Sequence, residues 1–206
     1  MDIGCGSGEY LSSAKAAGWN VRGIEASKRG AANACIKGLN VKNADIETAI
    51  MNFSDNYFDY INLSHVIEHV AKPLDIFFHC RIILSPKGRL FISTPNFESF
   101  DSKLFGIYWK HLSVPQHTQF FGRNSLIYAL ENAGFKNIKP YHQPVLPHKI
   151  QDLSFYSIHF ILKDKSLEII DKYWLLIKTT IRLFFKPFLA SSQKCPISEI
   201  ISITAE

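Results

Sequence analysis

The chain has 206 residues, of which 47% are hydrophobic and 20% are charged, with a formal net charge of +5. This length and composition suit one folded domain with a sizeable core and give no indication of disorder. The four cysteines form no C-x-x-C pair, which argues against a zinc ribbon or a disulfide framework and favours a reducing, cytoplasmic setting.

The first part of the chain alternates between strand and helix signals. It opens on the end of a strand and a glycine-rich loop, and apolar residues at helical spacing then predict a helix that Gly18 ends. A strand ending at Glu25, a helix capped by Ser27 and closed by Gly38, and a further strand over 39–44 follow. This alternation predicts a parallel sheet with covering helices.

The middle of the chain continues the alternation with longer elements. A buried strand is predicted over 57–64, and the next helix is predicted to bury one apolar face, formed by Ile76, Phe77, Cys80, Ile83 and Leu84. A turn at 85–88, "SPKG", leads into a strand that Pro95 stops. The aromatic-rich segment 97–122 is expected to be irregular and functional, because long loops without regular structure usually serve a function.

The last part of the chain is predicted to complete the sheet. Asn124 is expected to cap a helix that buries Leu126, Ile127 and Leu130 and ends at Gly134. Two strands are predicted over 135–142 and 198–206. We expect three units: a core over 1–149, a helical insertion or cap over 150–190, and a terminal strand within 191–206 that completes the core sheet.

Residues 171–188 are predicted to form a basic amphipathic helix, with Lys178, Arg182 and Lys186 four residues apart. The favoured interpretation is a helix packed on its own domain with a charged outer stripe. The alternative is peripheral contact with a membrane surface, where the helix would meet a lipid-linked acceptor. The segment is too charged to span a bilayer, nucleic-acid binding is not expected from this charge pattern, and the oligomeric state is left open.

Three glycines at alternate positions, Gly4, Gly6 and Gly8, follow Asp2 in the opening segment "MDIGCGSGEY". Glycines at this spacing let a backbone approach a ligand closely, and the start of the following helix attracts a negative group. The dinucleotide pattern G-x-G-x-x-G would require a glycine at position 9, where this chain has Glu9. A carboxylate facing a pyrophosphate counts against a nicotinamide cofactor.

The segment "DIGCGSG" instead resembles motif I of the class I S-adenosylmethionine-dependent methyltransferases, and "GIEAS", "ADIE" and "FDYINLSHVIEHV" continue the resemblance in register. The resemblance implies a Rossmann-like sheet in the order 3-2-1-4-5-7-6, with helices on both faces and an antiparallel strand 7. It also implies a set of S-adenosylmethionine contacts: Asp2, Gly4, Gly6 and Gly8 in the loop, Glu25 on the ribose hydroxyls, Asp45 on the adenine amine, Ile46 on the adenine ring, and the backbone at Leu63 and Ser64 along the methionine end.

Further blocks, "VIEHVAKP", "LSPKGRLFISTPN" and "YWKHLSVPQHTQFFGRNSLIYALENAGF", are similar to a broad subgroup that includes ubiquinone-biosynthesis O-methyltransferases. The similarity covers most of residues 1–143 and implies methyl transfer, with O-methylation of a small molecule or saccharide as the favoured reaction. If the methyl acceptor is a hydroxyl group, a base helps to remove its proton. His117, in the segment expected to fold over the acceptor, is the first candidate and His65 is the second, while Trp109, Phe120 and Phe121 are expected to shape the acceptor pocket.

The segment "HVIEH" allows two metal interpretations. It satisfies H-x-x-E-H, a zinc peptidase signature that needs both histidines on one helical face, but Pro73 limits any helix that begins at Ser64 to about two turns. In the ubiquinone O-methyltransferases an E-x-x-E-H segment at this place is associated with a divalent cation, which makes His65, Glu68 and His69 weak candidate ligands. The favoured interpretation is that Glu68 and His69 only stabilise the turn after the strand.

The opening segment has only Met1, Asp2 and Ile3 before the glycine loop, so the first and central strand of the implied sheet is expected to be very short. We expect Met1 to be an internal methionine of a longer protein or the result of a lost start. A degenerate relative that binds S-adenosylmethionine without transferring its methyl group is therefore the alternative to an active enzyme.

Overall fold

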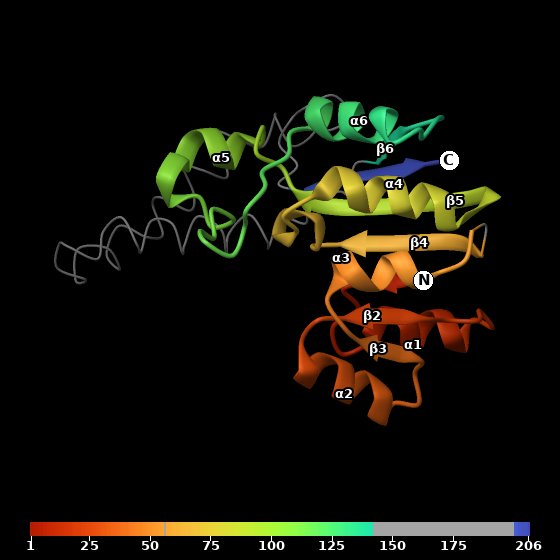
Figure 1. Ribbon diagram of the computed structural model, residues 1–206. Coiled ribbons are helices and arrows are strands. Elements are labelled where there is room, and N and C mark those ends of the chain that lie inside the picture. Colours follow the sequence, from red (N-terminus) through yellow and green to blue (C-terminus); the bar gives the residue numbers. More distant parts are fainter. Residues whose placement is uncertain (56, 142–199) are drawn as a thin grey trace, which may run out of the picture.

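The computed structural model describes residues 1–55, 57–141 and 200–206, and these form one seven-stranded sheet (Figure 1). The sheet order is β3-β2-β1-β4-β5-β7-β6, with β7 antiparallel to both neighbours and the pairs among β1 to β5 parallel. The predicted sheet order is therefore confirmed. The strands are β1 (Asp2–Ile3), β2 (Gly23–Glu25), β3 (Val41–Asn43), β4 (Phe58–Ser64), β5 (Leu84–Pro95), β6 (Lys139–Tyr141) and β7 (Ile200–Ala205).

The helices alternate with the strands over the first half of the chain, as predicted. The Ser27 side chain accepts the N–H of Gly30 and caps its helix, while Gly18, Gly38 and Gly134 adopt positive φ where their helices end. The α-helices are α1 (Glu9–Ala16), α2 (Lys28–Ile36), α3 (Ile46–Ala49), α4 (Pro73–Ile83), α5 (Phe100–Phe105) and α6 (Arg123–Asn132), with 3-10 turns η1 (Ile50–Asn52), η2 (Ile67–His69) and η3 (Gly106–Tyr108).

The main hydrophobic core lies between the β4–β5–β7 part of the sheet and helices α4 and α6, which contact one another. Four residues of the predicted face lie on α4 and are buried: Ile76, Phe77, Cys80 and Ile83 all have less than 3% of their surface exposed. Leu84, also predicted on this helical face, is buried but begins β5, because α4 ends at Ile83. On α6, Leu126 and Leu130 are buried and Ile127 is partly buried, as expected. This packing holds the carboxyl ends of β4 and β5 together at one edge of the sheet.

Three local predictions were wrong. Helix α6 begins at Arg123 with Gly122 as its N-cap, so Asn124 lies inside the first turn, and Ser125 accepts the Gly122 N–H. The 85–88 segment belongs to β5, because the register against β4 shifts there by a bulge. Segment 97–122 is not irregular throughout, since it contains α5 and η3, and the Ser99 side chain caps α5.

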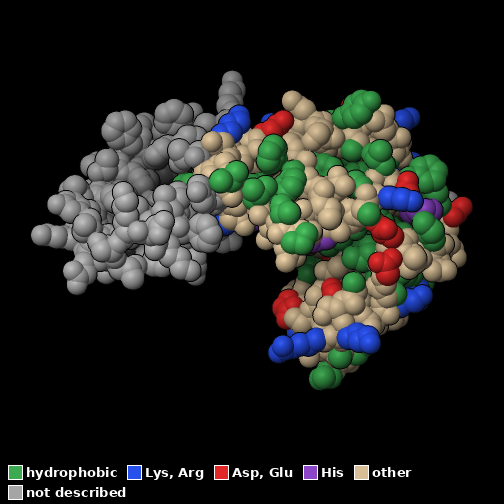
Figure 2. Space-filling model, turned by 60° about the vertical axis from the view of Figure 1, so that its left-hand side comes forward, with side chains coloured by type: hydrophobic (Ala, Val, Ile, Leu, Met, Phe, Trp, Pro, Cys, Tyr) green, Lys and Arg blue, Asp and Glu red, His purple; other side chains and the backbone are tan. Residues whose placement is uncertain are grey.

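Helix α5 lies beyond the end of the sheet at which β4 ends (Figure 1), so segment 97–122 borders that edge. Residues 150–190, including the predicted basic helix over 171–188, lie outside the described residues. Within the described ranges, no helix is both long and apolar enough to cross a membrane. On the face drawn in Figure 2, basic and acidic side chains are interspersed among hydrophobic ones, and they do not gather in a single patch of one sign.

Candidate active site

The glycine loop connects β1 to α1 and requires glycine for two physical reasons. Gly4, Gly6 and Gly8 all have positive φ, between 53° and 80°, a conformation that other residues rarely adopt. A Cβ on Gly4 would also lie 2.3 Å from the Val66 side chain, whereas a Cβ on Gly6 would meet nothing within 4 Å. The loop is therefore packed at one end against the turn after β4, and it has open space at its middle, where a ligand can approach.

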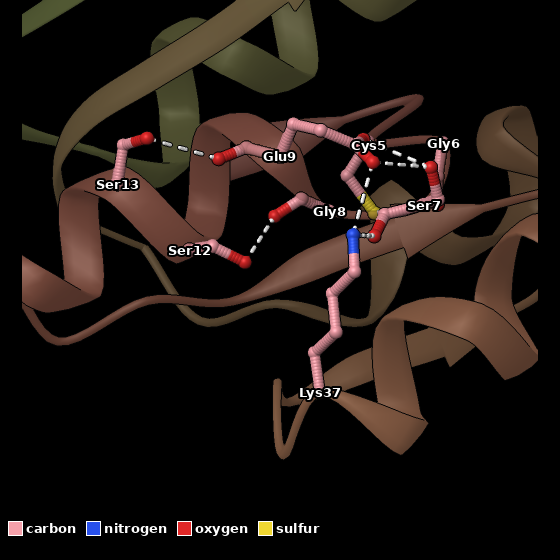
Figure 3. Close-up of polar contacts among 8 residues, drawn as sticks. All are labelled: Cys5, Gly6, Ser7, Gly8, Glu9, Ser12, Ser13 and Lys37. Carbon is pink, nitrogen blue, oxygen red and sulfur yellow. Dashed lines mark hydrogen bonds and ion pairs between the residues drawn. The ribbon is translucent and has the colours of Figure 1, made fainter.

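The carboxylate of Glu9 is held by the loop and by α2 (Figure 3). It accepts a hydrogen bond from the Ser7 hydroxyl and forms an ion pair with Lys37, whose Nζ also donates to the Ser7 carbonyl. These contacts, first the hydrogen bond from Lys37 and then that from Ser7, lower the pKa of Glu9 to about 2. The carboxylate at the start of α1 is thus ionised and paired locally with Lys37.

Asp2 is buried at the start of β1, beside Asn62 of β4. The Nδ2 of Asn62 donates to Asp2 Oδ1 over 2.7 Å, and burial raises the pKa of Asp2 to about 6 against the favourable effect of this bond. The backbone pairs Asp2 with Gly23 on one side and with Asn62 on the other. Asp2 therefore supports the loop from inside the sheet, and the part played by Asn62 was not predicted.

Glu25 ends β2 with its carboxylate directed at backbone donors. Its Oε2 accepts the N–H of Gly6 and its Oε1 accepts the N–H of Ser27, both over 2.7 Å. Each carboxylate oxygen has a second lone-pair position. The carboxylate is thus positioned in advance by the glycine loop and by the start of α2, and it keeps acceptor capacity for two hydroxyl groups.

Asp45 and Ile46 follow β3, as expected for residues near the same edge of the sheet. Asp45 caps α3, and its Oδ1 accepts the backbone N–H and the hydroxyl of Thr48. Ile46 packs with part of its surface against the main core. Only Oδ1 of Asp45 is engaged within the part of the chain described, so the other carboxylate oxygen is available to a donor such as an amine.

At the end of β4 the chain changes from strand to turn. Leu63 is fully buried, Ser64 is exposed and His65 has a positive φ of 55°. The N–H of His65 still donates to Ser93 of β5, while its Nδ1 lies 3.2 Å from Glu68 Oε1. Since Val66 packs on Gly4, His65 lies directly beside the glycine loop.

Residues 65–69 contain no α-helix, only the single 3-10 turn η2. His65 and His69 therefore do not share a helical face, and the zinc peptidase interpretation of H-x-x-E-H is wrong.

Glu68 links three separate segments around this turn. Its buried carboxylate accepts the hydroxyl of Thr94 in β5 and contacts His65, while its backbone carbonyl accepts the N–H groups of Thr118 and Gln119. Burial alone would raise the pKa of the Glu68 carboxyl, but its hydrogen bonds with His65, its own backbone and Thr94 hold it below its ordinary value. Glu68 thus connects the turn after β4 to β5 and to segment 97–122.

His117 lies beside His69, although the two residues come from different segments. Their rings meet edge to face with centroids 4.7 Å apart. The Nδ1 of His69 lies 2.9 Å from the Gln116 carbonyl, and the Nδ1 of His117 lies 2.7 Å from the His111 carbonyl. A ring nitrogen of each and a carboxylate oxygen of Glu68 lie within 4.8 Å of one another, whereas His65 is not a member of this group.

Aromatic side chains of segment 97–122 continue from this histidine pair. Phe97 contacts both Trp109 and Phe120, and Phe120 contacts His117. Phe121 is instead buried in the main core. Two buried side-chain polar atoms of the described residues have no hydrogen-bond partner, Nε1 of Trp109 and Nε2 of His111. Burial, with Lys110 and nearby histidines, lowers the pKa of His111 to about 4, so this ring is neutral at physiological pH.

These observations match a known family. Residues 1–139 fit the model of a family described as a methyltransferase domain, which is more than half of the chain. The chain belongs to this methyltransferase family. The family match covers the glycine loop, Glu25 and Asp45. It also covers the group formed by Glu68, His69 and His117.

Individual relatives agree with the family match. The chain is 33% identical over 105 residues to a ubiquinone biosynthesis O-methyltransferase of Actinobacillus pleuropneumoniae, which covers 47% of this chain and 45% of that protein. It is 28% identical over 149 residues to the same enzyme of Burkholderia multivorans, covering 69% and 63%. The chain thus spans less than two thirds of the length of these relatives.

A crystal structure of a SAM-dependent methyltransferase from Archaeoglobus fulgidus has the same fold. The TM-score is 0.66 at 21% identity, and the match covers 99% of this chain and 83% of that one.

Sequence reasoning missed the residues that hold the site from other strands. Asn62 and Thr94 lie on β4 and β5 and reach Asp2 and Glu68 across the sheet. A polar residue within a strand that is otherwise apolar is a usable signal, because a buried polar group needs a partner. Both residues stand in such strands.

Proposed function

We propose that this chain binds S-adenosylmethionine and transfers its methyl group to a hydroxyl oxygen of a small molecule or saccharide. The observation that carries the proposal is the meeting of the glycine loop, Glu25 and the His65–Glu68 pair at the carboxyl ends of β1, β2 and β4. In open α/β sheets, ligands bind outside the carboxyl ends of the strands. When bound there, S-adenosylmethionine supplies a methyl group on a sulfonium, which an oxygen nucleophile can accept.

The residues present fit this cofactor. Gly6 leaves open space at the loop, and Glu25 keeps free lone pairs beside the Gly6 N–H for two ribose hydroxyls. Asp45 offers its unengaged oxygen to the adenine amine, and Ile46 offers an apolar surface to the ring. The exposed Ser64 continues this line along the edge of the sheet toward His65.

Of the two histidines that are candidates to remove the hydroxyl proton, we favour His65. Its Nδ1 faces the Glu68 carboxylate, which orients the ring and leaves Nε2 as the proton acceptor. Its side chain is 44% exposed, so an acceptor hydroxyl can reach it. The hydroxyl oxygen forms the new bond to the methyl carbon, the proton moves to Nε2 of His65, and the electron pair of the broken carbon–sulfur bond stays on sulfur.

Two matched pairs of variants test the proposal. Glu25→Gln removes the charge that strengthens hydrogen bonds to the ribose, and we expect S-adenosylmethionine affinity to fall about 10- to 100-fold by isothermal titration. Glu131→Gln, on the exposed surface of α6, should leave the affinity unchanged. A folded wild-type chain that does not bind S-adenosylmethionine would overturn the cofactor assignment.

The base is tested separately, with tritiated S-adenosylmethionine and a panel of phenols and saccharides. We expect His65→Gln to keep cofactor affinity and to lose transfer by at least ~100-fold, the usual effect of removing a general base. His79→Gln, on α4, should keep both properties. Tight cofactor binding without transfer to any hydroxyl compound would support the degenerate relative instead.

A further inference from the structure

Glu68, His69 and His117 bring three metal-ligating groups together from two segments nearly 50 residues apart. One oxygen of Glu68 and one ring nitrogen of each histidine lie within 4.8 Å of one another. Glu68 and His69 belong to the turn after β4, whereas His117 belongs to segment 97–122. Only the tertiary fold brings these three groups together, so the set could not be recognised from the spacing of ligands along the sequence.

Contacts with backbone carbonyls orient the imidazole rings of His69 and His117 as in metal-binding histidines. Their Nδ1 atoms face backbone carbonyls, His69 toward Gln116 and His117 toward His111, at 2.9 and 2.7 Å. A carbonyl can only accept, so each Nδ1 carries the hydrogen and each Nε2 keeps a free lone pair. Metal-binding histidines in proteins are oriented in this way, with the second ring nitrogen donating to a carbonyl or a carboxylate.

Glu68 completes the set with a carboxylate that is itself held in place. Thr94 donates to Oε2 over 2.9 Å, and His65 Nδ1 lies 3.2 Å from Oε1. Each oxygen keeps one further lone pair. Two imidazoles and one carboxylate are the ligands of open zinc sites, which leave a fourth position for water or substrate.

We propose that Glu68, His69 and His117 bind one divalent cation of the zinc class, and that this cation fastens segment 97–122 to the end of β4. The ligand set excludes His65, so it is not the linear H-x-x-E-H motif. His65 faces Glu68 and acts on the carboxylate from outside the set. With two nitrogen ligands the site favours zinc or cobalt over magnesium, which prefers oxygen ligands.

The structural consequence follows from where His117 lies. The N–H groups of Thr118 and Gln119 already bond to the Glu68 carbonyl. A cation on Glu68, His69 and His117 would add a second link between the same two segments. The aromatic residues that precede His117, Phe97 and Trp109 among them, would then be held near the end of β4.

The test uses zinc alone with the full chain, in a Cys35→Ser background because the Cys35 thiol is exposed. Isothermal titration should give one zinc per chain, and cobalt should give the intense visible absorption of a site with four or five ligands. His69→Gln and His117→Gln should each weaken zinc binding by at least ~10-fold. Magnesium should bind far more weakly than zinc.

His79→Gln is the matched control and should keep zinc affinity within about threefold, whereas His65→Gln removes a contact of Glu68 Oε1 and should lose less affinity than either ligand variant. Unchanged binding in His117→Gln, or an equal loss in His65→Gln, would overturn the ligand set. Glu68→Gln should weaken zinc binding as well. Circular dichroism verifies the fold of each variant, and if Glu68→Gln does not fold, His69→Gln and His117→Gln are sufficient for the test.

Hydrogen–deuterium exchange measures the second half of the proposal. Zinc should slow exchange across residues 109–119 in the parent chain and not in His117→Gln. Exchange in this segment that is the same with and without zinc would overturn the fastening role. None of these measurements requires S-adenosylmethionine or an acceptor, so a failure here is separate from a failure of the proposed methyl transfer.

Discussion

The cofactor side and the histidine side of the site are held by different kinds of contact. On the cofactor side, Glu25 is bound by the backbone N–H groups of Gly6 and Ser27, and Gly4 packs directly on a neighbouring turn. On the histidine side, the rings of His69 and His117 are held by carbonyls of segment 97–122. The first side is part of the sheet, whereas the second is built on the segment that borders it.

This difference has a physical cause. A loop that follows a strand and opens a helix dictates its residue types through backbone conformation, so its pattern is visible over a few residues. A site assembled from segments 26 to 50 residues apart depends on where the sheet places them. The cofactor side should therefore respond to backbone substitutions, and the histidine side to the loss of single hydrogen bonds.

The largest effect is expected from Gly4→Ala. The new Cβ would lie 2.3 Å from Val66 Cγ2 in addition to the strain of a positive φ, and we expect a loss of about 2 to 5 kcal/mol in the free energy of unfolding. Gly134→Ala is the matched control, because Gly134 also has positive φ but a Cβ there meets nothing within 4 Å. It should lose only about 1 to 2 kcal/mol in urea denaturation. Equal losses in the two variants would mean that close packing of the loop contributes nothing.

More of the fold than of the candidate site could be predicted from the sequence. The sheet order followed from the family resemblance, and the Ser27 cap and the glycine helix ends were predictable because each depends on local backbone conformation. The expected cap at Asn124 failed because Gly122, two residues earlier, pairs with Ser125 and begins the helix. A polar residue near a helix start does not by itself identify the first residue.

The family resemblance implied a set of candidate cofactor contacts, and the structure places Glu25, Asp45 and Ser64 of that set at one edge of the sheet. The contact between His69 and His117 was not predictable, since no rule connects residues 48 positions apart. The contacts of Glu68 with Thr94 and Thr118 were missed for the same reason.

A smaller effect, and one that depends on pH, is expected from Asp2→Asn. Burial raises the pKa of Asp2 from 3.8 to about 6, so the folded state binds this proton more tightly than the unfolded state. The contribution of Asp2 to stability is therefore fully present below pH 3.8 and is lost as pH rises through 6, by about 3 kcal/mol at most. The asparagine side chain of the variant cannot titrate, and this part of the slope should disappear.

The measurement is urea denaturation of both proteins from pH 4 to pH 7. The two proteins differ only at residue 2, so the difference in the free energy of unfolding between them reports the contribution of Asp2. We expect the free energy of unfolding of Asp2→Asn to rise relative to that of the parent chain as pH rises. A constant difference would show that the Asp2 carboxylate is ionised at little cost inside the sheet.

The smallest effect is expected from Thr94→Val, which tests a residue of β5 that supports the histidine side. Valine keeps the shape of threonine but removes the hydroxyl that donates to Glu68 Oε2, and a hydrogen bond to a charged group contributes about 2 kcal/mol. Thr204→Val is the control, since its hydroxyl lies 3.5 Å from the Lys139 carbonyl at an exposed position, and it should change stability by less than about 0.5 kcal/mol. If the two variants lose the same amount, then the Glu68 carboxylate is held by His65 and its own backbone, and the histidine side depends on the sheet less than its geometry indicates.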